Sequence, residues 1–174
     1  PGKGSTFWFD IELPVPEDEP VVAKHETTQF DVIGYEGPRR RVLIVDDRHE
    51  NRMVLLNMLE PLGFEIILAE DGQDGLDKAA DLHPDFVLTD LMMPVMTGFE
   101  MVGRIRETPA VRDVPVVAVS ASVFDMDKEK SLNIGCQGFL SKPVESGRLL
   151  AIMAEQMGLV WTYREPPGGE EAID

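Results

Sequence analysis

Residues 85–94 read Asp-Phe-Val-Leu-Thr-Asp-Leu-Met-Met-Pro, a short apolar run that ends in Asp90 and stops before a proline. Apolar runs of this length, bounded by turn residues, are typical of strands that are buried on both faces. The run 41–45 ends in a similar way, because Asp46 and Asp47 follow it directly. If the two strands are parallel, the three acids lie at one edge of the sheet, where open α/β sheets bind their ligands.

Short apolar runs alternate with helical stretches from Arg39 to about Leu159, which is the pattern of successive strand–helix units. Apolar residues recur at helical spacing between the runs, as at Leu55 and Leu59. The sequence therefore predicts an α/β fold, a doubly wound sheet of five parallel strands with right-handed crossovers and helices on both faces. The strands are predicted at 41–45, 64–69, 85–89, 114–119 and 138–141.

The composition limits the class of protein. The chain has 174 residues, 43% of them hydrophobic, which is enough for one domain with short extensions. Its 16 Lys and Arg against 32 Asp and Glu argue against nucleic-acid binding, which needs a basic face. The single cysteine and the lack of a membrane-length apolar run favour a cytoplasmic fragment without membrane contact. The start at Pro1, without Met, suggests a longer parent protein that can itself be membrane-anchored.

The two ends of the chain differ from its centre. Residues 5–13 alternate apolar and polar side chains with period two, as a strand does. Residues 17–38 are rich in proline, glycine and acids and predict a linker. Residues 160–174 predict a flexible acidic tail, with too little apolar content for another element. A strand without its own sheet readily pairs with another chain, so residues 5–13 also allow a homodimer.

A serine and a lysine complete the predicted cluster at the strand ends. Ser120 follows the fourth predicted strand, and Lys142 follows the fifth. Crowded carboxylates repel one another unless a cation neutralises them, and Mg2+ prefers oxygen ligands while leaving room for a phosphate. The metal and Lys142 would compensate the charge of a phosphoryl group while Asp90 attacks it. The sequence thus predicts Mg2+ as the cofactor and phosphoryl transfer as the chemistry.

The segment 39–159 resembles a two-component response-regulator receiver domain. The matching pieces are Val45-Asp46-Asp47, Asp90-Leu-Met-Met-Pro94 with Gly98, Val119-Ser120-Ala121, and Phe139-Leu-Ser-Lys142-Pro143. The resemblance implies a flavodoxin-like (CheY-like) fold with strand order 2-1-3-4-5. It also implies a function in phosphorelay signalling, in which the domain accepts a phosphoryl group from phosphohistidine.

The resemblance assigns roles position by position. Asp90 would be the phosphoacceptor and, with Asp47, a direct metal ligand. Asp46 would act mainly through metal-bound water, and the Met92 backbone carbonyl would complete the protein's share of the coordination. Lys142 would contact the phosphoryl oxygens, and the peptide bond to the proline after it would be cis.

The resemblance also assigns a switch to Ser120 and Phe139. The Ser120 hydroxyl, drawn toward the phosphoryl oxygens, would vacate space into which the Phe139 ring turns, so a local charge change alters the surface. Ser120 and Ala121 would bind the phosphoryl group together with Lys142. Because Ala121 is small and Ser122 is short, water would reach the phosphoryl group, and self-dephosphorylation is expected.

A second resemblance concerns the start of the chain. Residues 1–16 are similar to the last strand of a histidine-kinase ATP-binding domain, where Gly-Ser-Thr-Phe precedes an alternating strand. The stretch 47–52, Asp-Arg-His-Glu-Asn-Arg, resembles that of receivers fused to kinases. Together they imply a hybrid sensor histidine kinase as the parent. The partner would be its kinase domain in cis or a histidine phosphotransfer protein, and the fragment would be a phosphoacceptor, not a complete enzyme.

Two other functions stay open from the residues. An aspartate-nucleophile phosphohydrolase has a similar sheet, but such enzymes generally need a second aspartate two positions after the nucleophile, where this chain has Met92. A scaffold that never accepts phosphate would use the fold for protein contacts alone. Three acids held together without a metal are electrostatically costly, which argues against the scaffold.

Overall fold

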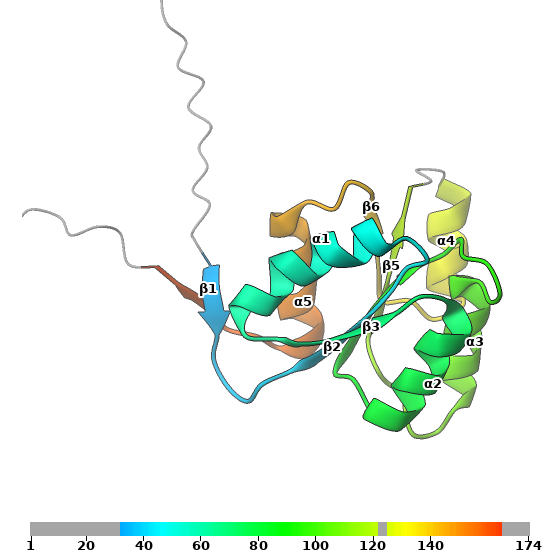
Figure 1. Ribbon diagram of the computed structural model, residues 1–174, viewed down its shortest axis with the longest axis horizontal. Helices are drawn as coiled ribbons and strands as arrows, with labels where there is room; N and C mark the ends of the chain where they lie inside the picture. The colour runs from blue at the N-terminus through cyan, green and yellow to red at the C-terminus, as the bar shows by residue number, and fades with distance from the viewer. Residues whose placement is uncertain (1–31, 122–124, 165–174) are drawn as a thin grey trace, which may run out of the picture.

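The computed structural model describes residues 32–121 and 125–164. Five parallel strands form the central sheet in the order β3-β2-β4-β5-β6 (Figure 1). The strands are β2 (Arg41–Val45), β3 (Glu65–Ala69), β4 (Phe86–Asp90), β5 (Val116–Ser120) and β6 (Gly138–Ser141). The predicted doubly wound sheet and its strand order are confirmed, and each predicted strand begins and ends within two residues of the observed one.

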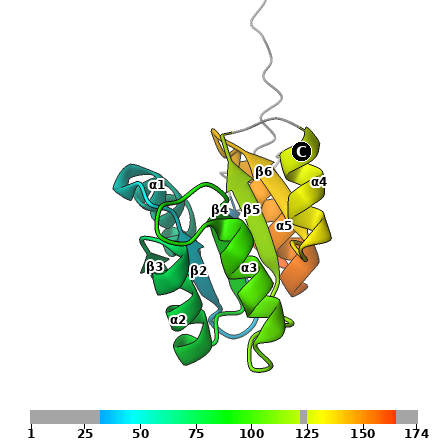
Figure 2. The same ribbon diagram turned by 90° about the vertical axis from the view of Figure 1, so that its right-hand side faces the viewer.

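Helices cover both faces of this sheet (Figure 2). On one face lie α1 (His49–Leu59), followed by the short 3-10 helix η1 (Glu60–Leu62), and α5 (Ser146–Met157). On the other face lie α2 (Gly72–Leu82) and α3 (Gly98–Glu107), with α4 (Asp125–Asn133) beside α3. The sheet is therefore buried on both sides, which explains why its strands read as continuous apolar runs.

Side-chain caps fix where two of the helices begin. The Asp71 carboxylate accepts hydrogen bonds from the backbone N–H groups of Gln73 and Asp74 at the start of α2. Thr97 and Glu100 form a capping box at the start of α3, each side chain bonded to the other's backbone N–H. Such caps satisfy N–H groups that have no partner within the helix. They set the ends of the loops that follow β3 and β4.

A second sheet of two strands lies at the amino ends of the central strands. β1 (Val32–Tyr35) pairs antiparallel with β7 (Trp161–Tyr163). The Tyr35 ring stacks on the Phe64 ring with centroids 4.5 Å apart, and the Trp161 ring lies edge-on to both at 6.2 Å. The prediction of a linker through residue 38 and of no element after residue 160 is therefore wrong for these two strands.

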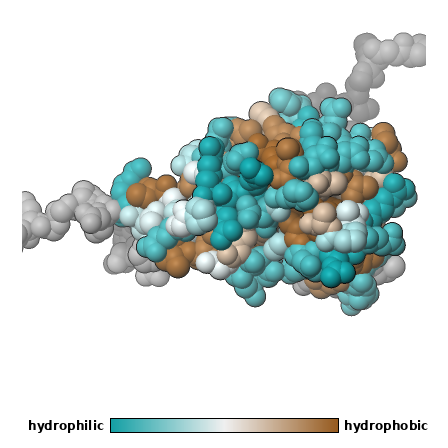
Figure 3. All heavy atoms as spheres, turned by 90° about the horizontal axis from the view of Figure 1, so that it is seen from below, coloured by the Kyte–Doolittle hydropathy of each residue, from teal (hydrophilic) through white to brown (hydrophobic). Residues whose placement is uncertain are grey.

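The surface is mixed in character. Hydrophilic residues cover much of the face shown in Figure 3, with hydrophobic patches between them. The large apolar side chains that are exposed lie on several different elements: Ile33, Val54, Leu82, Met92, Val95, Leu132, Val160 and Tyr163. No helix in the described residues combines the length and apolar content that crossing a membrane requires. The alternating segment 5–13 lies outside the described residues.

Candidate functional site

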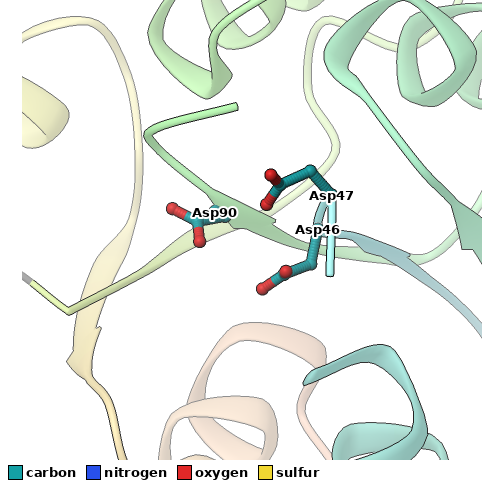
Figure 4. A group of neighbouring side chains, drawn as sticks. All are labelled: Asp46, Asp47 and Asp90. Carbon is teal, nitrogen blue, oxygen red and sulfur yellow. The ribbon is translucent and has the colours of Figure 1, made fainter. Parts of the chain in front are cut away.

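Three carboxylates meet at the carboxyl ends of two neighbouring strands (Figure 4). Asp46 and Asp47 follow β2, and Asp90 ends β4. One oxygen of each carboxylate lies within 4.8 Å of the others. Because β2 and β4 are paired in parallel, their ends place these acids side by side, as the sequence predicted.

The three acids differ in exposure. Asp46 is 2% exposed and Asp90 is 9% exposed, whereas Asp47 is open to solvent. Figure 4 shows the three side chains projecting from the strand ends into a common space. Two buried carboxylates next to an exposed one are unfavourable unless positive charge is nearby, because like charges repel and burial disfavours ionised groups.

Lys142 supplies positive charge to this cluster. Its Nζ donates hydrogen bonds to Asp46 Oδ2, at 2.7 Å, and to Asp90 Oδ2. Burial lowers the pKa of Lys142. The hydrogen bonds and charges of Asp46 and Asp90 raise it by a larger amount, so the pKa of Lys142 lies above its ordinary value. Lys142 is therefore an ammonium at neutral pH. Its peptide bond to the following proline is cis, as expected.

The other predicted residues lie around the same edge of the sheet. Ser120 ends β5 and is 2% exposed, and Ala121 after it is exposed. The backbone N–H of Lys142 donates to the Ser120 carbonyl at 2.8 Å, which joins the ends of β5 and β6. Phe139 lies in β6, half-buried against the core on the α2–α3 face. The Met92 backbone N–H donates to Asp90 Oδ1 at 2.9 Å, while 67% of the residue is exposed.

The loop after Asp90 depends on a glycine. The Gly98 N–H donates to the Leu91 carbonyl at 3.1 Å. A Cβ on Gly98 would lie 2.0 Å from the Asp90 carbonyl oxygen, far inside van der Waals contact. Only glycine therefore lets the start of α3 approach the end of β4 this closely.

Two residues of α1 that contact Asp46 were missed as site residues in the sequence. Asn51 Nδ2 donates to Asp46 Oδ1 at 2.9 Å and to Oδ2 at 3.0 Å. Arg52 Nη1 donates to the Asp46 carbonyl at 2.6 Å. The available signal was a polar Asn-Arg pair in the first turn of the helix that follows the acids, and polar residues in a first turn are too common to indicate a site.

The donor atoms decide which metals fit. The three carboxylates offer only oxygen, and the Met92 carbonyl lies in the adjoining loop. Oxygen sets of this kind suit hard divalent cations such as Mg2+, whereas soft metals prefer sulfur or imidazole ligands. The charges also match, because three carboxylates and one ammonium leave two negative charges for a divalent cation to neutralise.

Comparison with known proteins gives consistent matches. A family model described as response regulator receiver domain matches residues 42–154. The polar-differentiation response regulator DivK of Brucella ovis is 30% identical over 119 residues, which cover 68% of this chain and 97% of DivK. The sensory/regulatory protein RpfC of Xanthomonas campestris is 32% identical over 175 residues, covering 88% of this chain but only 24% of RpfC.

Among solved structures, one similar protein has a metal at its site. It is the receiver domain of the sensor histidine kinase PA1611 from Pseudomonas aeruginosa, with a TM-score of 0.65 and 30% identity. The similarity covers 70% of this chain and 99% of that domain. A magnesium ion is coordinated in the active site cleft of that structure.

Proposed function

The chain belongs to the response regulator receiver domain family of two-component signalling, and we propose that Asp90 is its phosphoacceptor and works with Mg2+. The observation that carries the proposal is the meeting of three carboxylates with one ammonium at the strand ends. A phosphoryl group carries charge that must be neutralised as it arrives, and this cluster offers an ammonium and a place for a divalent cation.

In this proposal, four residues have different parts in the coordination of the metal. Asp47, Asp90 and the Met92 backbone carbonyl would hold Mg2+, and Asp46 would act mainly through water bound to the metal. When bound, Mg2+ supplies positive charge that screens the crowded carboxylates and the phosphoryl oxygens. The magnesium ion in the PA1611 receiver domain supports this assignment.

The chemical step is an in-line displacement at phosphorus. A carboxylate oxygen of Asp90 forms a bond to phosphorus while the bond from phosphorus to the donor histidine nitrogen breaks, and that nitrogen keeps the electron pair. The Lys142 ammonium turns from the Asp90 carboxylate to the phosphoryl oxygens. Ser120 and Ala121, at the end of β5, bind the same oxygens. Water later attacks the phosphorus of this acyl phosphate, which releases inorganic phosphate and returns Asp90 to its carboxylate.

A conformational readout follows from the position of Ser120 and Phe139. Ser120 ends β5 at the site, and Phe139 lies on the neighbouring strand β6, half-buried. We propose that the Ser120 hydroxyl moves toward the phosphoryl group and that the Phe139 ring turns inward. The charge change at Asp90 then reaches the surface on the β5–β6 side of the domain.

We propose that this chain belongs to a longer hybrid sensor histidine kinase, which lies in the cytoplasm or is anchored to a membrane. Support comes from RpfC, whose match covers more of this chain than the match to DivK does. The proposed phosphodonor is the kinase domain in cis or a histidine phosphotransfer protein. Partner identity is tested by mixing this chain with a phosphorylated transfer domain and following loss of phosphate from the histidine.

Intact mass after incubation with a small phosphodonor tests the function itself. The wild type is expected to gain one phosphoryl group with Mg2+ and none after chelation of the metal, and Asp90→Asn is expected to gain none. No addition under any condition would favour a scaffold. Rapid multiple turnover of the donor would favour a phosphohydrolase, which the exposed Met92 in place of a second aspartate makes the weaker alternative.

A further inference from the structure

Several donors hold the Asp46 carboxylate, and the proposed function leaves one of them, Asn51, without a role. Asn51 Nδ2 contacts both of its oxygens, at 2.9 and 3.0 Å. The backbone N–H of Arg48 donates to Oδ1 at 2.9 Å, and Lys142 donates to Oδ2 at 2.7 Å. A carboxylate has about four lone-pair positions, so these four contacts leave Asp46 little capacity to bind a metal directly.

The Asp47 carboxylate, in contrast, has open oxygens. It is exposed, and within the described residues its oxygens make no hydrogen bond or ion pair. A cation that enters the cluster therefore meets open oxygens on Asp47 and oxygens on Asp46 that already accept hydrogen bonds. The difference between these two adjacent acids comes from α1, because Asn51 provides two of the contacts to Asp46.

We propose that Asn51 is a positioning residue: its amide fixes the Asp46 carboxylate so that Asp47 and Asp90 take the Mg2+ and Lys142 stays shared between Asp46 and Asp90. This inference rests on the proposed function. Groups that orient metal-site carboxylates through hydrogen bonds are typically worth about 10–100-fold in metal affinity.

The chemistry of an amide suits this role. Asn51 donates hydrogen bonds without adding positive charge, so the cluster keeps the two negative charges that a divalent cation needs. A lysine or arginine there would compete with the metal for the acids. The same helical turn also holds the backbone of Asp46 in place, because Arg52 Nη1 donates a hydrogen bond to its carbonyl at 2.6 Å. α1 therefore fixes both the main chain and the side chain of Asp46.

The test measures Mg2+ binding without phosphorylation, by titrating MgCl2 and following amide chemical shifts by NMR. Asn51→Ala removes the amide, and its Mg2+ dissociation constant is expected to rise by about tenfold. Asn51→Gln carries the same amide one methylene further out and is expected to recover part of the affinity. Asn57 is a matched control, an exposed asparagine on the same helix, and Asn57→Ala is expected to bind Mg2+ as the wild type does.

The outcomes separate this inference from the proposed function. A wild type that binds no Mg2+ would overturn both. A wild type that binds Mg2+ while Asn51→Ala binds it within twofold would overturn the inference alone, as would an equal loss in Asn57→Ala. If Asn51→Ala does not fold, Asn51→Ser decides the question. Its shorter hydroxyl cannot reach both Asp46 oxygens, so the same loss of affinity is expected.

Discussion

Lys142 Nζ lies 2.7 Å from Asp46 Oδ2 and donates a second hydrogen bond to Asp90. In the absence of a phosphoryl group, the lysine therefore neutralises the proposed nucleophile and holds two strand ends together. The same contact makes Lys142 a competitor of Mg2+ for the Asp90 carboxylate. Its charge is useful for catalysis only once the phosphoryl oxygens replace that carboxylate as its partner.

The two roles of Lys142 predict that its removal has opposite effects on Mg2+ binding and on phosphorylation. Lys142→Ala should bind Mg2+ more tightly, because a competing cation is gone. It should accept phosphate from a small donor at least about tenfold more slowly, because one charge that compensates the phosphoryl oxygens is gone. The control is Lys78→Ala, which removes a half-exposed lysine paired with Asp74 on α2. A phosphorylation rate equal to the wild type would contradict the role of Lys142.

Two glycines of α3 should respond in opposite directions to alanine. Gly98→Ala places a Cβ against the Asp90 carbonyl, so urea unfolding should show a large loss of stability together with slower phosphorylation. Gly103→Ala meets nothing within 4 Å and should stabilise the helix by about 0.5–1 kcal/mol. Equal effects of the two substitutions would show that the close approach at Gly98 is not required.

The aromatic contacts of the two-stranded sheet should stabilise the domain without affecting its chemistry. Trp161→Ala removes a half-buried ring from Tyr35 and Phe64 and should cost about 2 kcal/mol, below the ~3–5 kcal/mol typical of fully buried aromatic rings. Tyr163→Ala, on the same strand but more exposed, should cost less. Phosphorylation should be unchanged in both variants, because this sheet lies at the opposite ends of the strands from Asp90.

The buried thiol predicts a pH dependence of stability. Burial raises the pKa of Cys136 to about 11, although the charge of Arg106 lowers it somewhat. In the unfolded chain the thiol ionises near its ordinary value, so the unfolded state is favoured as pH rises from about 8.5 toward 11. Ionisation of the Cys136 thiol in the unfolded chain should therefore lower the free energy of unfolding by about 2 kcal/mol across that range. Urea unfolding of the wild type and of Cys136→Ala at pH 8 and pH 10.5 checks this prediction. An equal loss of stability with pH in the two proteins would contradict it.

The central sheet could be predicted because its signals are local. Each strand is a short apolar run followed by turn residues, and burial on both faces removes any need for alternation. The acids could be placed together for a related reason, since parallel strands align their carboxyl ends. Lys142 could be assigned to the same edge without any knowledge of distances.

The parts that could not be predicted depend on contacts between distant segments. β1 and β7 are too short to show a period, and what holds them is the packing of Tyr35 and Trp161 on Phe64. Asn51 looks like an ordinary polar residue of a first helical turn, and only the path of α1 brings its amide to Asp46. Such roles depend on tertiary geometry, which a sequence pattern does not contain.

The most direct experiment locates the phosphoryl group on the chain. The protein is incubated with Mg2+ and a small phosphodonor and treated with borohydride, which reduces an acyl phosphate to an alcohol, and its peptides are then mapped by mass spectrometry. We expect homoserine at position 90, dependent on Mg2+ and on the donor. Homoserine at Asp46 or Asp47 instead, or a phosphorylated protein with Asp90 unreduced, would contradict it.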